Sequence, residues 1–290
     1  MSDSTKGYLL GALGVLIFAV TLPMTKLAIS GGGAGGLSPL FVTLGRAAVA
    51  GLCSVVYLAV TRAPLPTREQ AFWLVVTGLG NVIGFPLFLA LGVKHVDAIH
   101  ASVVTGALPL ATAAFAALWL GQRASFRFWA LAVFGFALIV LYAWLSGGEG
   151  GFSPADGLLL LAVLSASASY ALGARLSREM KAEHVICWIL VFFLPIMAPA
   201  AWWIAPTAPV APIAWLGFAY VALFSMWLGF FAWYRGLALG GAMRVSQIQL
   251  AQPFLSMIFA VPILGEDLTL LSMVFCLAII ATVALSRKAR

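Results

Sequence analysis

The chain has 290 residues, of which 63 % are hydrophobic and 9 % are charged, and its formal net charge is +7. Water-soluble domains carry about 45–50 % apolar and about 25 % charged residues, so this composition excludes a soluble fold. The basic residues are spread over short loops and form no patch, so nucleic-acid binding is not expected. The sequence predicts an all-α membrane protein.

Ten segments are long and apolar enough to be membrane helices, since a helix needs about 20 residues to cross the hydrocarbon core. They are 8–29, 40–60, 72–91, 98–119, 127–145, 156–175, 185–204, 214–234, 243–264 and 268–285. The first run is longer than a signal-peptide core of about 7–15 residues, so we expect a retained helix. Stretches rich in Gly and Pro separate several of the spans, at 30–39, 61–67, 146–154 and 205–212.

The distribution of Lys and Arg predicts the orientation. With a cytoplasmic N-terminus, 13 of these residues fall on the cytoplasmic side and two, Lys26 and Lys94, fall outside, while Arg46 lies within the second span. Cytoplasmic loops of membrane proteins are enriched in positive charge. We therefore expect ten spans with both termini in the cytoplasm.

The chain repeats itself about half-way along its length. Residues 92–121 align with 236–265 at an offset of 144 without a gap, and nine of the 30 positions are identical. This predicts two repeats of five helices, at 1–145 and 146–290. Because five is an odd number, the second repeat enters the membrane from the opposite side, which is the inverted arrangement of many secondary transporters.

A polar stripe is kept at both symmetry-related places. In span nine, Ser246, Gln249, Pro253 and Ser256 recur at steps of three, four and three, so they share one helix face, and their counterparts in span four are Ser102, Thr105, Pro109 and Thr112. Asn81 of span three likewise matches Ser225 of span eight. The pattern predicts a shared aqueous cavity, with Pro109 and Pro253 as helix breaks. Its alternative is that these side chains hold helices together through interhelical hydrogen bonds.

Three amides add weight to the cavity interpretation. Gln247, Gln249 and Gln252 lie close together in span nine, and an unmatched buried amide costs a few kcal/mol. A water-filled or substrate-filled cavity would satisfy all three of these side chains.

Spans four and nine each have a proline near the middle, and they close with Leu-Gly-Gln at 120–122 and Leu-Gly-Glu at 264–266. This two-copy arrangement resembles the EamA domains of the drug/metabolite transporter superfamily. Within that family the chain is most similar to YddG-type exporters of aromatic and other amino acids. The resemblance implies a ten-helix carrier of the bacterial inner membrane. It also implies a central cavity lined by spans one, three, four, six, eight and nine.

Arg46 lies about seven residues into span two, and burying it costs about 2.5–3.5 kcal/mol on insertion scales. It would serve as a fixed cation that attracts a substrate carboxylate, or alternatively as a snorkelling or helix-bridging residue. Tyr170 and Trp227 fall on spans assigned to the cavity. Amides, hydroxyls and aromatic faces together suit a zwitterion with an apolar side chain.

The sequence predicts a transporter rather than an enzyme, because it has no catalytic motif, no Cys/His cluster and no carboxylate in the middle of a span. We expect no metal or cofactor. The expected partners are an amino-acid substrate and the lipid bilayer, and the sequence is compatible with a monomer. A channel or receptor is an alternative, as is an exporter of other small metabolites or lipophilic cationic drugs.

The central turns of the spans offer no group that titrates near neutral pH. His95 and His100 do titrate in that range, but they lie near the outer end of span four. We therefore expect facilitated export by alternating access, in which the substrate runs down its own gradient.

Overall fold

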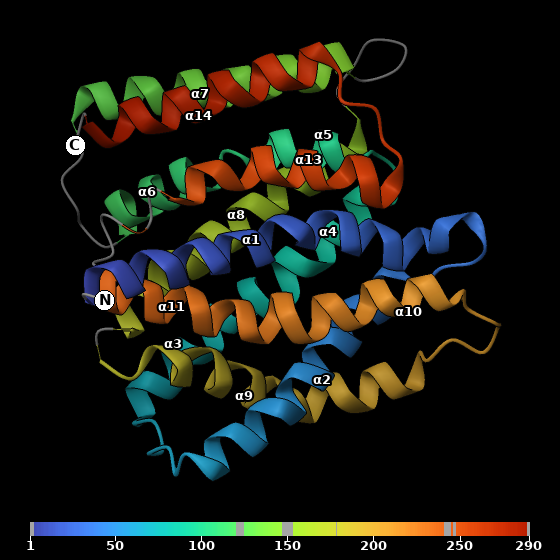
Figure 1. Cartoon of the computed structure of the whole chain (residues 1–290). Coiled ribbons are helices and arrows are strands. Elements are labelled where there is room, and N and C mark those ends of the chain that lie inside the picture. Colours follow the sequence, from blue (N-terminus) through green and yellow to red (C-terminus); the bar gives the residue numbers. More distant parts are fainter. Residues whose placement is uncertain are drawn as a thin grey trace.

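The computed structural model describes residues 3–119, 125–146, 153–177, 179–240, 245 and 248–288, and within these ranges it contains helices and no strand (Figure 1). Eight helical stretches in the described part are apolar and long enough to cross a membrane. Two shorter apolar helices, Ile248–Leu264 and Leu270–Ser286, complete a set of ten. The ten segments coincide with the ten predicted spans, so the predicted all-α, ten-helix fold is confirmed.

The first five spans are continuous helices or short series of helices. They are α1 (Asp3–Ser30), α2 (Pro39–Val60), α3 (Arg68–Gly78) with η2 (Leu79–Gly84) and α4 (Phe85–Val93), α5 (Ala98–Thr105) with α6 (Leu108–Trp119), and α7 (Phe126–Ser146). A short helical turn, η1 (Gly31–Gly33), follows α1.

The last five spans repeat this plan. They are α8 (Pro154–Leu176), α9 (Ala182–Trp203), α10 (Pro212–Ala219) with η3 (Tyr220–Leu228) and α11 (Gly229–Gly240), η4 (Ile248–Ala251) with α13 (Gln252–Leu264), and α14 (Leu270–Lys288).

Local sequence signals explain where several helices begin and end. Helices α2, α8 and α10 each begin at a proline, whose missing N–H is tolerated in the first helical turn. The backbone N–H groups at the start of α3 and α8 are capped by the side chains of Thr67 and Ser153. Helix α13 ends at Gly265, whose φ of 70° is a left-handed conformation that glycine adopts without strain.

The two halves of the chain interlock around one core. Helix α1 packs against α10, α11 and α13, while α8 packs against α4 and α6, so the first helix of each half contacts the third and fourth spans of the other half. Helices α2 and α9 pack together on one flank of the bundle, and α7 and α14 pack together on the opposite flank (Figure 1).

Glycines allow the closest of these contacts. A Cβ atom on Gly236 of α11 would lie 2.6 Å from the backbone nitrogen of Gly11 in α1, and a Cβ atom on Gly80 would collide with Ser169 of α8. Small residues permit such backbone approach between membrane helices.

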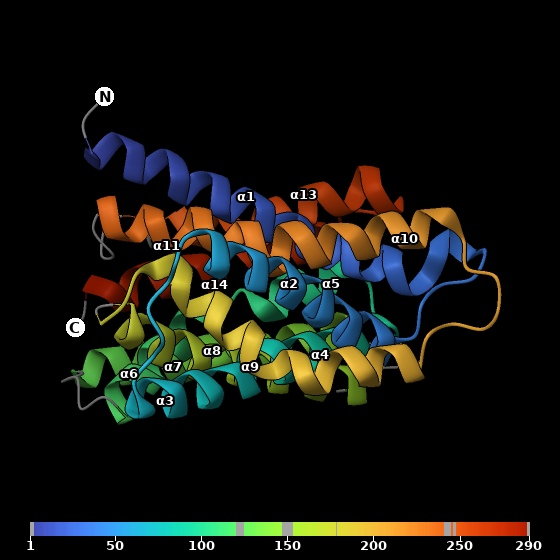
Figure 2. The same ribbon diagram turned by 90° about the horizontal axis from the view of Figure 1, so that it is seen from below.

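The two ends of the bundle differ. Helix α1 begins and α14 ends at the same end (Figures 1 and 2). Lys26, Asp97 and Glu266 lie together at the other end, where α1 and α13 finish and α5 begins. We call these the termini end and the Glu266 end.

Candidate substrate cavity

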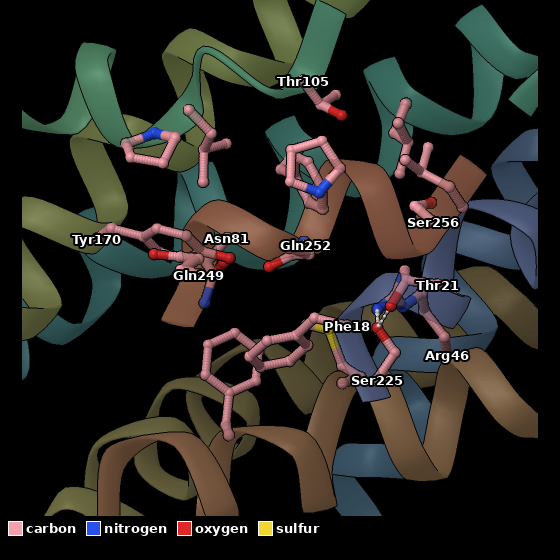
Figure 3. Close-up of a pocket in the computed structure, with 18 residues that line it drawn as sticks. Phe18, Thr21, Arg46, Asn81, Thr105, Tyr170, Ser225, Gln249, Gln252 and Ser256 are labelled. Carbon is pink, nitrogen blue, oxygen red and sulfur yellow. Dashed lines mark hydrogen bonds between the residues drawn. The ribbon is translucent and has the colours of Figure 1, made fainter. Parts of the chain in front are cut away.

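A cavity lies in the centre of the bundle, lined by eighteen residues from spans one, two, three, four, six, eight and nine (Figure 3). All six spans that the resemblance implied contribute side chains to the lining, and the peripheral helix α2 contributes one more, Arg46. The cavity volume is about 50 Å³, which is room for about four water molecules.

Most of the residues predicted from the sequence line this cavity. They are Arg46, Asn81, Thr105, Pro109, Tyr170, Ser225, Gln249, Gln252 and Pro253. They come from six different helical spans, and the folded chain brings them together around one space. Ser256, on the same stripe of span nine, also lines it.

Two predicted residues lie elsewhere. Ser102 is fully buried and its hydroxyl donates to the Ala98 carbonyl oxygen one turn earlier (2.7 Å). Trp227 packs its ring against Tyr57 and Phe231. It stands two residues after Ser225 in the same π-helical segment, about half a turn away, and so points to the opposite side of the helix. A third predicted residue, Ser246, lies outside the described residues.

The spans around the cavity are irregular at matching positions. Asn81 lies in the π-helical segment η2 of span three, and Ser225 lies in the π-helical segment η3 of span eight. Span four has a turn between α5 and α6, just before Pro109, and span nine has the tight helix η4 just before Pro253. Such irregular turns interrupt the regular backbone hydrogen-bond pattern and are frequent at functional sites.

Arg46 is the single charged residue in the lining formed by the described part of the chain. Its side chain is almost completely buried, with 3 % of the residue exposed. Nη2 donates to the Ser225 hydroxyl (3.1 Å), which also accepts a hydrogen bond from Thr21 (2.9 Å). These three side chains are joined in Figure 3. The Nε atom has no partner in the described structure.

None of the ion pairs among the described residues includes Arg46. A buried charge without a partner carries a desolvation penalty of several kcal/mol. The guanidinium group is therefore available to an anion that these residues do not supply. Its burial in the lining is not the position of a side chain that snorkels toward the lipid interface, and its hydrogen bond to Ser225 bridges spans two and eight. Carboxylate binding by Arg46 stays a prediction.

Two further buried polar atoms of the cavity lining have no hydrogen-bond partner in the described structure, Oε1 of Gln252 and Oγ of Ser256. Buried polar atoms are paired in most proteins, so these two atoms of the lining are free to hydrogen-bond a ligand or water in the cavity. Thr21 was not expected at this site. Its hydroxyl in the middle of an apolar first span is the signal that could have identified it.

A group of charged residues lies at the Glu266 end of the bundle, outside the lining of the central cavity. Lys26 Nζ donates to Asp97 Oδ1 (2.9 Å) and lies 3.7 Å from Glu266 Oε1. The two carboxylate oxygens of Glu266 accept the backbone N–H groups of Ala98 and Ile99, each at 2.8 Å. A carboxylate is stabilised at a helix N-terminus, so Glu266 joins the end of span nine to the start of α5. We call Lys26, Asp97 and Glu266 the clasp.

A second polar group joins α5, α7 and α8 at the same end. His100 Nε2 lies 2.6 Å from Asp156 Oδ1, and its Nδ1 lies 3.1 Å from the Ser146 hydroxyl. The other oxygen of Asp156 accepts from the backbone N–H and the hydroxyl of Ser153. His100 is therefore held by neighbouring helices and is absent from the central cavity's lining.

The fold defines a multi-pass membrane protein with a central cavity. The EamA-like transporter family matches the chain twice, over residues 5–144 and 153–287. The chain therefore belongs to the EamA-like transporter family, as its resemblance to EamA domains predicted.

Two curated relatives extend this result. The chain is 40 % identical to the uncharacterized transporter YdeK of Bacillus subtilis (strain 168), over 99 % of both chains. It is 28 % identical to a probable terminal-alkyne amino-acid exporter of Streptantibioticus cattleyicolor, over 88 % of this chain and 84 % of that protein. A solved crystal structure with 20 % identity aligns over 99 % of both chains with a TM-score of 0.65, which establishes the shared fold alone.

Proposed function

We propose that this EamA-family transporter exports amino acids, mainly aromatic and other uncharged ones, through the central cavity by alternating access. The observation that carries the proposal is the buried guanidinium group of Arg46, which lines the cavity without an acidic partner in the described structure. A guanidinium group binds a carboxylate through parallel hydrogen bonds, and every amino acid carries a carboxylate.

The remaining lining suits the rest of an uncharged amino acid. The rings of Phe18, Phe85 and Phe230 and several aliphatic side chains offer an apolar surface for its side chain. The amide oxygen of Gln252 has a free lone pair for its ammonium group. The relative named as a probable terminal-alkyne amino-acid exporter supports the same substrate class, since an alkyne is apolar and uncharged.

We place the termini end in the cytoplasm and the Glu266 end outside, in a bacterial inner membrane, because of the excess of Lys and Arg in the loops of the termini end. The clasp then closes the outer exit while substrate enters from the cytoplasm. The described lining of the cavity contains no Asp, Glu or His. Export is accordingly facilitative and follows the substrate's own gradient.

The test is counterflow with purified protein in proteoliposomes. Vesicles loaded with unlabelled phenylalanine should take up labelled phenylalanine transiently and saturably, with no pH gradient and with a protonophore present. Flux without saturation or counterflow would identify a channel. Uphill accumulation driven by an imposed pH gradient would overturn the facilitative mechanism.

Lipophilic cations are the rival substrates within this class of carrier. Their binding would bring a second positive charge next to Arg46, with no carboxylate from the described residues in the lining to balance it. Two like charges in a buried site repel each other strongly. The same vesicles should therefore show no counterflow of a lipophilic cation such as tetraphenylphosphonium.

A further inference from the structure

The positive and negative charges in the cavity lining are unequal in number, and this imbalance affects which charged group of a substrate is recognised. An amino acid carries one negative and one positive group. The described lining offers one full positive charge, at Arg46, and no full negative charge. The carboxylate thus has an ionic partner, whereas the ammonium group has only neutral oxygen atoms to accept its hydrogen bonds.

Some neutral acceptors of the lining are already engaged. Thr105 already uses its hydroxyl to donate to the Ala101 carbonyl (2.8 Å), and Ser225 accepts from both Arg46 and Thr21. Oε1 of Gln252 and Oγ of Ser256 are buried without a partner in the described structure, and Asn81, Gln249 and Tyr170 also bring neutral side-chain oxygen atoms to the lining. In Figure 3 the Gln252 side chain is drawn between the group of Arg46, Thr21 and Ser225 and the group of Asn81, Tyr170 and Gln249.

Electrostatics then favours a substrate with a single negative charge. When a carboxylate binds to Arg46, the site becomes neutral overall, which is the least costly state for a buried region. When a zwitterion binds, a net positive charge remains in the cavity, and neutral oxygen atoms such as that of Gln252 compensate it only in part.

We infer that the site recognises a carboxylate attached to an apolar group and does not require the α-amino group, so that the transporter also accepts monocarboxylates such as des-amino analogues of apolar amino acids. This inference rests on the proposed function, because it assigns the substrate class of the same cavity. Gln252 is then the residue that sets how well the amino group is tolerated.

The test uses two sets of three compounds, which separate the contribution of the carboxylate to binding from that of the amino group. The first set is L-phenylalanine, 3-phenylpropanoate without the amine, and 2-phenylethylamine without the carboxylate. The second set is L-leucine, 4-methylpentanoate and 3-methylbutylamine, so that the fit of one side chain does not decide the result. Each compound competes at pH 7.4 with labelled phenylalanine for binding to the purified full-length protein in detergent.

We expect each acid to compete at concentrations within about threefold of its amino acid, and each amine to require at least about thirtyfold more. Arg46→Gln should weaken competition by acids and amino acids alike. Gln252→Leu should change the ratio between them, by raising the concentration needed for the amino acid relative to the acid. Thermal unfolding of both variants checks that the protein remains folded.

If the acids need more than tenfold higher concentrations than the amino acids, the amino group is required, and the inference is wrong while amino-acid export stands. If labelled phenylalanine does not bind while labelled 2-phenylethylamine, measured directly, does, both the inference and the proposed function are wrong. An unchanged acid-to-amino-acid ratio in Gln252→Leu would remove the role assigned to Gln252.

Discussion

Charged side chains have different partners at the Glu266 end and in the centre of the cavity. In the clasp, Lys26 has two acidic neighbours, and Glu266 also accepts two backbone N–H groups. In the cavity, Arg46 has one neutral hydroxyl partner and an unpaired Nε atom. Charges that the protein pairs by itself hold helices together, whereas a charge left unpaired is available to a ligand. The two regions should therefore respond differently to substitution.

The largest effect is expected at Arg46. Arg46→Gln should lower amino-acid counterflow by roughly 30-fold or more, since removing one partner of a buried charge pair costs about 2–5 kcal/mol. The same substitution should leave the unfolding temperature unchanged or raise it, because the folded protein no longer buries an unpaired charge. Counterflow in proteoliposomes and thermal unfolding in detergent measure the two quantities.

Lys94→Gln is the matched control, because Lys94 is an exposed cation without an ion pair in the described structure. It should change neither the flux nor the unfolding temperature. A large loss of stability in Arg46→Gln with normal flux per folded molecule would mean that Arg46 bridges helices and does not bind substrate.

The second largest effect is expected at Glu266, where substitution should lower the stability of the protein. Glu266→Gln removes the charge that pairs with Lys26 and one of the two acceptors at the start of α5. Hydrogen bonds to charged groups contribute about 1.5–3 kcal/mol, so we expect a loss of that order in unfolding free energy. Asp267→Asn is the control, because Asp267 is exposed and has no ion pair in the described part of the chain.

The clasp also makes a prediction about conformation. A cysteine introduced at Thr105 should become more accessible to a polar reagent from the Glu266 end when Glu266→Gln is also present, because the clasp no longer holds that end closed. Equal labelling rates with and without Glu266→Gln would show that the clasp stabilises the helices without gating the cavity.

A smaller effect is expected for His100→Gln. His100 bridges Asp156 and Ser146, but Asp156 keeps its two hydrogen bonds from Ser153 in the variant. We expect a loss of about 1 kcal/mol in unfolding free energy and counterflow that persists without a pH gradient. If wild-type flux follows an imposed pH gradient and His100→Gln abolishes that response, the His100–Asp156 pair is a proton site.

The sequence predicted the helices well for a simple physical reason. Each membrane span needs about twenty apolar residues, which face either lipid or the protein interior, so the hydropathy of the sequence is enough to locate the spans. The helix breaks were harder to predict from the sequence. Pro109 and Pro253 indicated two of them. The π-helical segments around Asn81 and Ser225 have no such sequence signal and occur where helices pack closely, as Gly80 does against Ser169.

Site residues were predictable where helical periodicity applies. Thr105 and Gln249 stand on faces that the mirrored stripe marked, and both line the cavity. The clasp could not be predicted from the sequence, because Ala98 and Glu266 are 168 positions apart and nothing in the sequence fixes their contact before folding. The same holds for Thr21, whose partner Ser225 is 204 positions away.

The smallest effects distinguish Ser102 from Ser256, two serines from the mirrored stripes. Ser102 forms a hydrogen bond within its own helix and lies outside the cavity's lining, so Ser102→Ala should change stability by about 0.5 kcal/mol or less and leave flux unchanged. Ser256 lines the cavity with an unpaired hydroxyl, so Ser256→Ala should be neutral in stability but lower flux a few-fold. Parallel unfolding and counterflow measurements on the two variants test this. Equal flux in both would mean that the hydroxyl of Ser256 contacts no substrate, and reduced flux in Ser102→Ala would place Ser102 on the transport path in another conformation of the carrier.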